Sequence, residues 1–115
     1  MSPPNPPSYR DEHLYVDLRQ QLVMLDGETV RLNRDESRLL ALLIEHVGVV
    51  VTRPILLMQI WGHAEIQRRV DACIRGLRRK LGVYFDRHIE AVFGVGYRFL
   101  PPLPRSRGSK SFFTV

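Results

Sequence analysis

The sequence contains a single cysteine, Cys73, so no disulfide can form within the chain. One thiol is also too few for a cysteine-rich zinc module, and the fold must therefore be held together by packing. The longest apolar runs, residues 39–44 and 47–51, fall far short of the roughly 20 residues that a membrane-spanning helix needs. The first residues lack the basic and apolar regions of a secretory signal. We therefore expect a protein of the reducing cytoplasm without a membrane partner.

Residues for catalysis or metal binding are also scarce. The four histidines are scattered, and none lies at helical spacing from a second metal-type ligand. No Ser, His and Asp pattern of a hydrolase is visible. Residues 94–96, Gly-Val-Gly, lack the third glycine and the following helix of a dinucleotide-binding motif, so they predict a turn. The sequence thus predicts no catalytic residues, no metal site and no cofactor.

Basic residues dominate the second half of the chain. The 115 residues include 17 Lys or Arg and 12 Asp or Glu, a net charge of +5. Residues 10–46 contain five Arg and eight acids, whereas residues 47–115 contain twelve Lys or Arg and four acids. This asymmetry indicates a surface that faces a polyanion, although basic residues also serve simply to solvate a surface.

The length and the ends of the chain predict one domain with loose segments attached. A chain of this size buries enough surface for one core but not for a separate catalytic domain. Four of the first nine residues are proline, so residues 1–12 are predicted to be a linker or a disordered arm. Residues 102–115 are predicted to be a basic tail in which Phe112 and Phe113 dock or fray. The folded domain then spans residues 13–101.

Hydrophobic periodicity predicts an α+β domain over these residues. Asp26-Gly27 predicts a hairpin turn, and Asn33 with Glu36 three residues later predicts the capped start of the first helix. Gly62 and Gly82 predict the ends of the second and third helices. The expected elements are strands over 14–16, 22–25 and 29–32, a helix between 33 and 48, helices over 55–61 and 65–81, and strands over 89–92 and 97–100.

The third predicted helix, about residues 65–81, separates apolar and basic residues on two faces. Its apolar stripe consists of Val70, Ile74, Leu77 and Leu81. The opposite face consists of Arg68, Ala72, Arg75 and Arg79. A helix fits the major groove of DNA, where small Ala72 and Gly76 would let the backbone approach and Arg would bind phosphate or guanine. The alternatives are a solvated basic face and a membrane-surface helix, and the latter is disfavoured because the core needs the apolar stripe.

Short helix, turn, long basic helix and β-hairpin, in this order, are the elements of a winged helix-turn-helix. Four stretches carry a more specific match: LNRDE at 32–36 with LL at 39–40; VVTR at 50–53 and IWG at 60–62; RRVD at 68–71 with Ile74 and LRRKL at 77–81; and GVGYRF at 94–99. Together they resemble the C-terminal effector domain of OmpR/PhoB-type bacterial response regulators, over residues 13–101. The resemblance implies a four-stranded N-terminal sheet, three helices and a C-terminal hairpin.

The resemblance also implies a function, namely sequence-specific binding of double-stranded DNA by a transcriptional regulator of the two-component type. The recognition helix, about residues 65–81, would lie in the major groove, and the hairpin, about residues 89–100, would form a wing near the minor groove. Such domains typically bind direct repeats as tandem homodimers, and residues 62–67 correspond to a loop that contacts RNA polymerase. The implied DNA-binding residues are Trp61, Arg68, Arg69, Ala72, Arg75, Gly76, Arg78, Arg79, Phe93 and Tyr97.

These residues have different implied roles. Arg68 and Arg78 match positions that contact the DNA backbone, and Trp61 and Tyr97 match positions near it. Arg75 and Arg69 are the better candidates for reaching base edges, since both are expected on the exposed side of the helix.

Three residues depart from the family's pattern. Gly76 stands where a base-contacting Arg is common, and Cys73 stands where a His is common and is expected to be a small buried thiol. Phe93 replaces the usual Arg of the wing, and it can either wedge between base steps or contact another protein. The alternative function is therefore a degenerate winged-helix module for protein interaction that has lost specific DNA readout, with Phe93 and the Phe112-Phe113 pair as apolar contacts.

Overall fold

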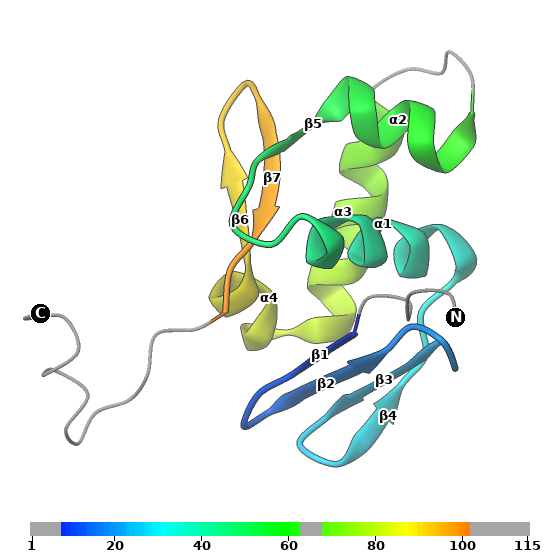
Figure 1. The fold of residues 1–115 in the computed structure, drawn as a ribbon, viewed down its shortest axis with the longest axis vertical. Coiled ribbons are helices and arrows are strands. Elements are labelled where there is room, and N and C mark those ends of the chain that lie inside the picture. Colours follow the sequence, from blue (N-terminus) through cyan, green and yellow to red (C-terminus); the bar gives the residue numbers. More distant parts are fainter. Residues whose placement is uncertain (1–7, 63–67, 102–115) are drawn as a thin grey trace, which may run out of the picture.

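The computed structural model describes residues 8–62 and 68–101, which fold into two sheets and four helices (Figure 1). The first sheet has four antiparallel strands in chain order, β1 (Ser8–Arg10), β2 (Leu14–Asp17), β3 (Leu22–Leu25) and β4 (Glu28–Val30). The helices are α1 (Arg34–Glu45), α2 (Arg53–Trp61), α3 (Arg68–Leu81) and α4 (Val83–His88). The second sheet has the order β5-β7-β6, with β5 (Val51–Thr52), β6 (Ile89–Val92) and β7 (Gly96–Phe99). The predicted α+β winged helix-turn-helix is confirmed.

The hairpin of β3 and β4 confirms the predicted turn at Asp26-Gly27. Leu25 pairs with Glu28, which leaves a two-residue loop, and both loop residues have positive φ, 49° for Asp26 and 84° for Gly27. Two successive residues with positive φ are what the favoured two-residue hairpin turn requires.

The first strand corrects the prediction of a linker or an arm over residues 1–12 at residues 8–10 only, since residues 1–7 lie outside the described part of the chain. Residues 8–10 form β1, in which Tyr9 pairs with Val16 of β2. The ring of Tyr9 also packs edge-on against Phe99 of β7, with 4.8 Å between the ring centroids. A three-residue strand beside prolines shows no periodicity of its own, because its stability comes from the neighbouring strand and from a residue far along the chain. The four-stranded sheet implied by the resemblance is confirmed.

The starts of α1 and α2 follow from their capping residues. Asn33 Oδ1 accepts a hydrogen bond from the Glu36 N–H at 2.8 Å, and Glu36 Oε1 accepts one from the Asn33 N–H at 3.0 Å, which is a complete capping box. Thr52 Oγ1 caps α2 by accepting from the Ile55 N–H at 3.4 Å.

No helix within the described ranges, 8–62 and 68–101, is long and apolar enough to span a bilayer.

The described residues contain a fourth helix that the prediction of three helices missed. Gly82, with a φ of 61°, ends α3, and α4 follows at once over six residues. Phe85 and His88 lie three residues apart on α4 and are both buried. So short a helix spans too few residues for hydrophobic periodicity to identify it. Its stability comes from the burial of these two side chains.

The β6–β7 hairpin confirms the predicted wing, and β5 extends it to three strands. Val51 of β5 pairs with Tyr97, and Thr52 pairs with Gly96, which opens β7. A Cβ atom at residue 96 would lie 2.1 Å from the carbonyl oxygen of Val51. This close approach of two backbones explains why a glycine occupies position 96.

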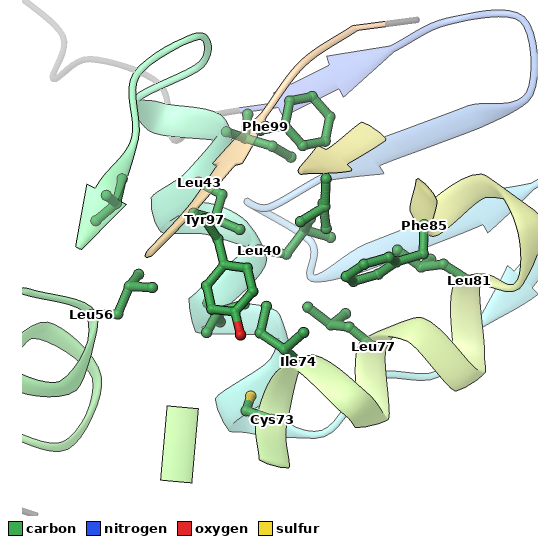
Figure 2. Packing of buried hydrophobic residues seen from close by; sticks show 14 of the residues in the cluster. Leu40, Leu43, Leu56, Cys73, Ile74, Leu77, Leu81, Phe85, Tyr97 and Phe99 are labelled. Carbon is green, nitrogen blue, oxygen red and sulfur yellow. The ribbon is translucent and has the colours of Figure 1, made fainter. Parts of the chain in front are cut away.

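The core lies where the helices meet the two sheets (Figures 1 and 2). Ile74 and Leu77 of α3 point toward Leu40 of α1 and Tyr97 of β7 (Figure 2). The predicted stripe of α3 is buried throughout, at Val70, Ile74, Leu77 and Leu81. Cys73 is only 8% exposed, and burial, helped by the carboxylates of Glu36 and Asp35, raises the pKa of its thiol to about 12. The expected small buried thiol is confirmed.

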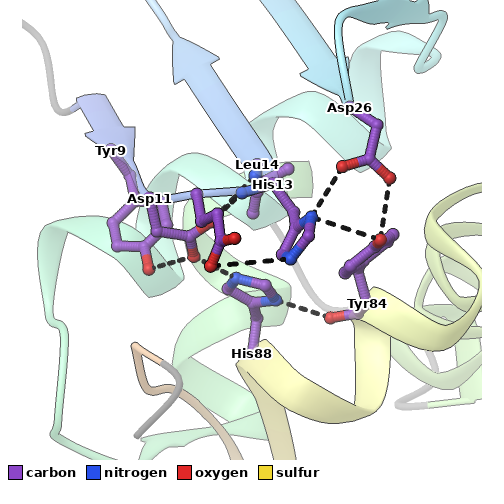
Figure 3. Close-up of polar contacts among 8 residues, drawn as sticks. Tyr9, Asp11, His13, Leu14, Asp26, Tyr84 and His88 are labelled. Carbon is purple, nitrogen blue, oxygen red and sulfur yellow. Dashed lines mark hydrogen bonds and ion pairs between the residues drawn. The ribbon is translucent and has the colours of Figure 1, made fainter. Parts of the chain in front are cut away.

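A cluster of polar side chains joins the N-terminal sheet to α4 (Figure 3). Asp11 accepts hydrogen bonds from the Tyr9 hydroxyl and from the N–H groups of His13 and Leu14, and its carboxylate faces the ring of His88. Beside it, the Tyr84 hydroxyl donates to Asp26 Oδ2 at 2.7 Å, and His13 Nδ1 lies 2.6 Å from Asp26 Oδ1. The cluster gives each of these polar groups a hydrogen-bond partner within the chain.

Candidate nucleic-acid interface

The exposed face of α3 is lined with arginine. The helix contains six Lys or Arg and one acid, Asp71. The side chains that α3 exposes are Arg68, Arg69, Ala72, Arg75, Arg78 and Arg79. The predicted arrangement, an apolar face in the core and a basic face outside, is confirmed. We call these six residues the α3 face.

Two arginines of the α3 face pack their guanidinium groups against aromatic rings. The guanidinium of Arg69 lies 5.3 Å from the ring centroid of Trp61, at the end of α2. The guanidinium of Arg78 lies 4.7 Å from the ring centroid of Phe85 and 3.5 Å from the carboxylate of Asp86, and its side chain is 58% exposed. Such contacts limit the orientations that a long side chain samples while leaving its charge near the surface.

Trp61 itself is half-buried between α1 and α3. Its indole N–H donates to Asp35 Oδ2 at 3.2 Å, so this polar group has a partner within the chain. Trp61 therefore holds Arg69 against the fold, and its own N–H is directed at α1.

Gly76 is not on the α3 face, which corrects its predicted place beside a groove. The residue is buried against α1, where a Cβ atom would lie 2.2 Å from Glu36 Oε2. Glu36 is itself 3% exposed, and its Oε1 forms an ion pair with Lys80 Nζ at 2.6 Å. Because Gly76 has no side chain, there is room for the buried carboxylate of Glu36. Sequence spacing alone does not reveal this contact between α1 and α3.

Tyr97, which the resemblance places near the DNA backbone, is also buried. Its side chain is 6% exposed, and its hydroxyl donates to Asp71 Oδ1 at 2.7 Å. The same oxygen accepts from Arg53 Nε at 2.9 Å, and the Arg53 guanidinium lies 5.3 Å from the Tyr97 ring centroid. We call Arg53, Asp71 and Tyr97 the Asp71 triad.

The Asp71 triad brings together the start of α2, the first turn of the described part of α3 and the strand β7. Burial tends to raise the pKa of Asp71, but the hydrogen bonds from Arg53 and Tyr97 and the charges of Arg53 and Arg75 lower it overall. The carboxylate is therefore ionised at neutral pH. Sequence reasoning assigned Arg53 and Asp71 no role, since 18 residues separate them and only the fold brings them together.

Phe93 is 98% exposed between β6 and β7. The loop and its flanks, residues 92–96, contain no charged residue, and the neighbouring Val95 is 44% exposed. Farther down the hairpin, Arg98 forms an ion pair with Glu90. The wing therefore ends in an apolar surface, as the sequence predicts.

Several predicted features lie outside the described residues. Residues 63–67, which make up most of the implied polymerase contact at 62–67, are not described, and neither are residues 102–115 with Phe112 and Phe113. Among the described residues, no three His, Cys, Asp or Glu side chains come together as ligands for a metal ion.

Comparison with known proteins places this chain in a family. The family model for the C terminus of transcriptional regulatory proteins matches residues 27–99. The chain is 37% identical over 89 residues to the phosphate regulon transcriptional regulatory protein PhoB of Pseudomonas aeruginosa, covering 75% of this chain and 38% of PhoB. It is 38% identical over 92 residues to the transcriptional activator protein PfeR of the same organism, covering 76% and 30%. The chain thus spans well under half the length of either relative.

Two solved structures share the fold. The response regulator DrrB of Thermotoga maritima, an OmpR/PhoB homolog, matches with a TM-score of 0.75 and 33% identity over 81% of this chain and 44% of DrrB. The DNA-binding domain of RstA from Klebsiella pneumoniae, crystallised in complex with the RstA box, matches with a TM-score of 0.72 and 32% identity, over 82% and 97%. The chain belongs to the transcriptional regulatory C-terminal domains, the winged helix-turn-helix effector domains of OmpR/PhoB-type response regulators.

Proposed function

We propose that this domain binds double-stranded DNA sequence-specifically, as part of a bacterial transcriptional regulator of the two-component type. The proposal rests on the two faces of α3. The helix buries its apolar stripe and exposes the five arginines of the α3 face to solvent. A helix so presented fits the major groove, and arginine binds both phosphate and guanine edges. The RstA domain, which was crystallised in complex with the RstA box and shares this fold, supports binding of DNA by this chain.

The contacts divide into positioning and readout. We assign Arg68 and Arg78 to the DNA backbone, with Arg79 beside them on the same exposed surface. Arg69 and Arg75 are assigned to base edges, because both are exposed on α3. Ala72 lies between them and allows the helix backbone to approach the groove.

Trp61 acts in this proposal through Arg69, which it orients by the contact between ring and guanidinium. Phe93 carries the wing's contact, as an apolar wedge at the minor groove in place of a cation. We further propose that the domain binds direct repeats as a tandem homodimer and contacts RNA polymerase through residues 62–67. It would act in the cytoplasm, where bacterial DNA lies. The family relationship supports these parts.

Selection from a random duplex library at moderate salt tests the proposal. Enrichment of one motif, above all of a direct repeat, is the expected result, and the affinity for the enriched duplex should fall as salt increases. Binding without sequence preference, or no binding, would contradict it.

The exposure of Phe93 favours a second candidate function, that of a protein-interaction module. This candidate predicts that the library yields no motif. It also predicts that Phe93→Ala abolishes capture of a partner, whereas Arg75→Ala leaves that capture unchanged.

A further inference from the structure

We infer that Asp71 is a positioning residue that fixes the orientation of α3 relative to the β6–β7 wing and thereby sets the domain's preference for one DNA sequence over others. The inference rests on the proposed function and deepens it. It concerns a residue that contacts no DNA in the proposal and acts through two other side chains, Arg53 and Tyr97.

The wing is held to the start of α2 by backbone contacts. Val51 and Thr52 of β5 pair with Tyr97 and Gly96 of β7. The Arg53 N–H, at the first residue of α2, donates to the Val95 carbonyl oxygen at 3.2 Å. Because these contacts involve main-chain atoms, β5, β7 and the start of α2 form one unit whatever their side chains are.

The Asp71 triad joins α3 to this unit through one carboxylate oxygen. Asp71 Oδ1 accepts both from Arg53 Nε at 2.9 Å and from the Tyr97 hydroxyl at 2.7 Å. The donors come from α2 and β7, and the guanidinium also lies against the tyrosine ring. Hydrogen bonds weaken steeply when their angles change, so two bonds from different directions restrict rotation of α3 relative to the wing.

The charge of Asp71 makes a purely electrostatic role in DNA binding implausible. It is the one acid in the described part of α3, which contains six Lys or Arg, and its side chain is 33% exposed beside the α3 face. An anion there repels a phosphate backbone and lowers affinity for every duplex alike. The groups that face it are Arg53 from α2, Tyr97 from β7 and Arg75 from α3 itself. Its presence is explained if the orientation that it fixes favours the correct sequence by more than its charge costs.

Orientation matters most where α3 and the wing must fit the DNA at once. A selected duplex satisfies base contacts only when α3 and the wing are in register with it, whereas a random duplex is held by phosphates that tolerate small rotations. Loss of the Asp71 triad should therefore reduce the ratio of specific to nonspecific affinity, rather than affinity in general.

Tyr97→Phe tests this without changing any charge, because it removes only the hydroxyl that donates to Asp71. The matched control is Tyr84→Phe on α4. It removes a hydroxyl that donates to Asp26 at 2.7 Å, the same distance as between the Tyr97 hydroxyl and Asp71. Dissociation constants are measured at one salt concentration for the selected duplex and for a scrambled duplex of the same composition. We expect Tyr97→Phe to lower the ratio of the two affinities about fivefold, as for the loss of one hydrogen bond, and Tyr84→Phe to leave it unchanged.

Asp71→Asn provides a second variant that keeps an acceptor oxygen and removes the charge. We expect it to bind the scrambled duplex more tightly than wild type while its preference for the selected duplex decreases. Thermal unfolding of each variant shows whether it is folded, and if Tyr97→Phe does not fold, Asp71→Asn decides the question.

The outcomes separate the two claims. If wild type prefers a motif and both folded variants keep its affinity ratio, the inference about Asp71 is overturned and the proposed function stands. An equal loss of affinity for both duplexes also overturns it, since a merely structural role predicts that result. If wild type shows no preference among duplexes, the proposed function fails and the inference fails with it.

Discussion

His88 and Asp11 are 77 residues apart in the chain, yet His88 Nε2 lies 2.6 Å from Asp11 Oδ2. His88 ends α4 directly before the wing strand β6, whereas Asp11 lies between β1 and β2 of the N-terminal sheet. The other ring nitrogen of His88 donates to the Tyr84 carbonyl oxygen at 2.6 Å. This contact joins the N-terminal sheet to the base of the wing, and it makes the stability of the domain depend on an ionised carboxylate.

Asp11 should make the domain sensitive to acid. Burial alone raises the pKa of this carboxyl, but hydrogen bonds from Tyr9, the Leu14 N–H, His88 and the His13 N–H outweigh burial and lower the pKa from 3.8 to about 2. A carboxyl whose pKa is lowered by folding stabilises the fold above its unfolded pKa, and this contribution is lost as the pH falls toward the folded pKa. We expect Asp11→Asn to be about 2 kcal/mol less stable than wild type at neutral pH.

Urea unfolding at a series of pH values checks this expectation. The difference between wild type and Asp11→Asn should be constant above about pH 5, shrink through about pH 4 and nearly disappear near pH 2. Glu12→Gln is the matched control, because Glu12 is the next residue and its side chain is 81% exposed. A difference between wild type and Asp11→Asn that does not change with pH would mean that the carboxylate's charge contributes nothing.

Gly76→Ala should have opposite effects in two backgrounds. Alanine is about 1 kcal/mol more favourable than glycine inside a helix, so the substitution alone favours α3. In this fold, however, the new Cβ would lie 2.2 Å from Glu36 Oε2, and moving that carboxylate would break its contacts with the Asn33 N–H and Lys80. We expect Gly76→Ala to destabilise the wild-type domain.

The same substitution should stabilise a Glu36→Ala background by up to about 1 kcal/mol. Denaturant unfolding of the four proteins in this double-mutant cycle measures the coupling between residues 36 and 76. Equal effects of Gly76→Ala in both backgrounds would show that the carboxylate does not require the glycine.

Local signals in the sequence predicted some elements of this structure and missed others. The difference depends on whether an element is stabilised by its own residues or by residues far away in the chain. The capping box of Asn33 and Glu36 and the stripe of α3 were predictable because their spacing is set by the helix itself. The strand β1 and the helix α4 were missed because each depends on distant residues, such as Tyr9 on Phe99. Short elements of this kind have weak intrinsic preferences, so tertiary contacts decide their structure.

The interface was predicted in outline, but its internal contacts were not. Charge and periodicity indicated the α3 face, since both are properties of one helix. Gly76 was expected to let the helix approach the groove and Tyr97 to lie near the DNA backbone. In the structure, Gly76 makes room for Glu36 and Tyr97 donates to Asp71. Neither partner can be inferred from spacing, because each belongs to a different element.

Arg75→Ala and Arg68→Ala should weaken DNA binding in different ways. For Arg75, assigned to a base edge, we expect a loss of about 1–3 kcal/mol on the selected duplex and relaxed preference at one position. For Arg68, assigned to a phosphate, we expect weaker binding to all duplexes and a salt dependence with a slope reduced by about 1.

Arg31→Ala is the matched control for both variants. Arg31 is an exposed arginine that directly follows β4 and is not part of α3, so its loss changes the net charge equally without removing a residue of the α3 face. Binding isotherms on selected and scrambled duplexes at several salt concentrations distinguish the cases. If Arg31→Ala weakens binding as much as Arg75→Ala does, only the total charge of the domain matters.

Phe93→Arg should change how the wing binds. The wing tip, residues 92–96, contains no cation, so in this proposal it contributes by apolar contact rather than by neutralising phosphates. An arginine at position 93 would enter the negative potential of a narrow minor groove, and we expect tighter binding to A·T-rich flanks with a steeper salt dependence. Phe93→Ala should instead weaken binding to the selected duplex several-fold without changing the salt slope, because it removes contact area and no charge. If both variants bind the selected duplex as wild type does, the exposed phenylalanine does not touch DNA, and capture of a protein partner becomes the better explanation of its exposure.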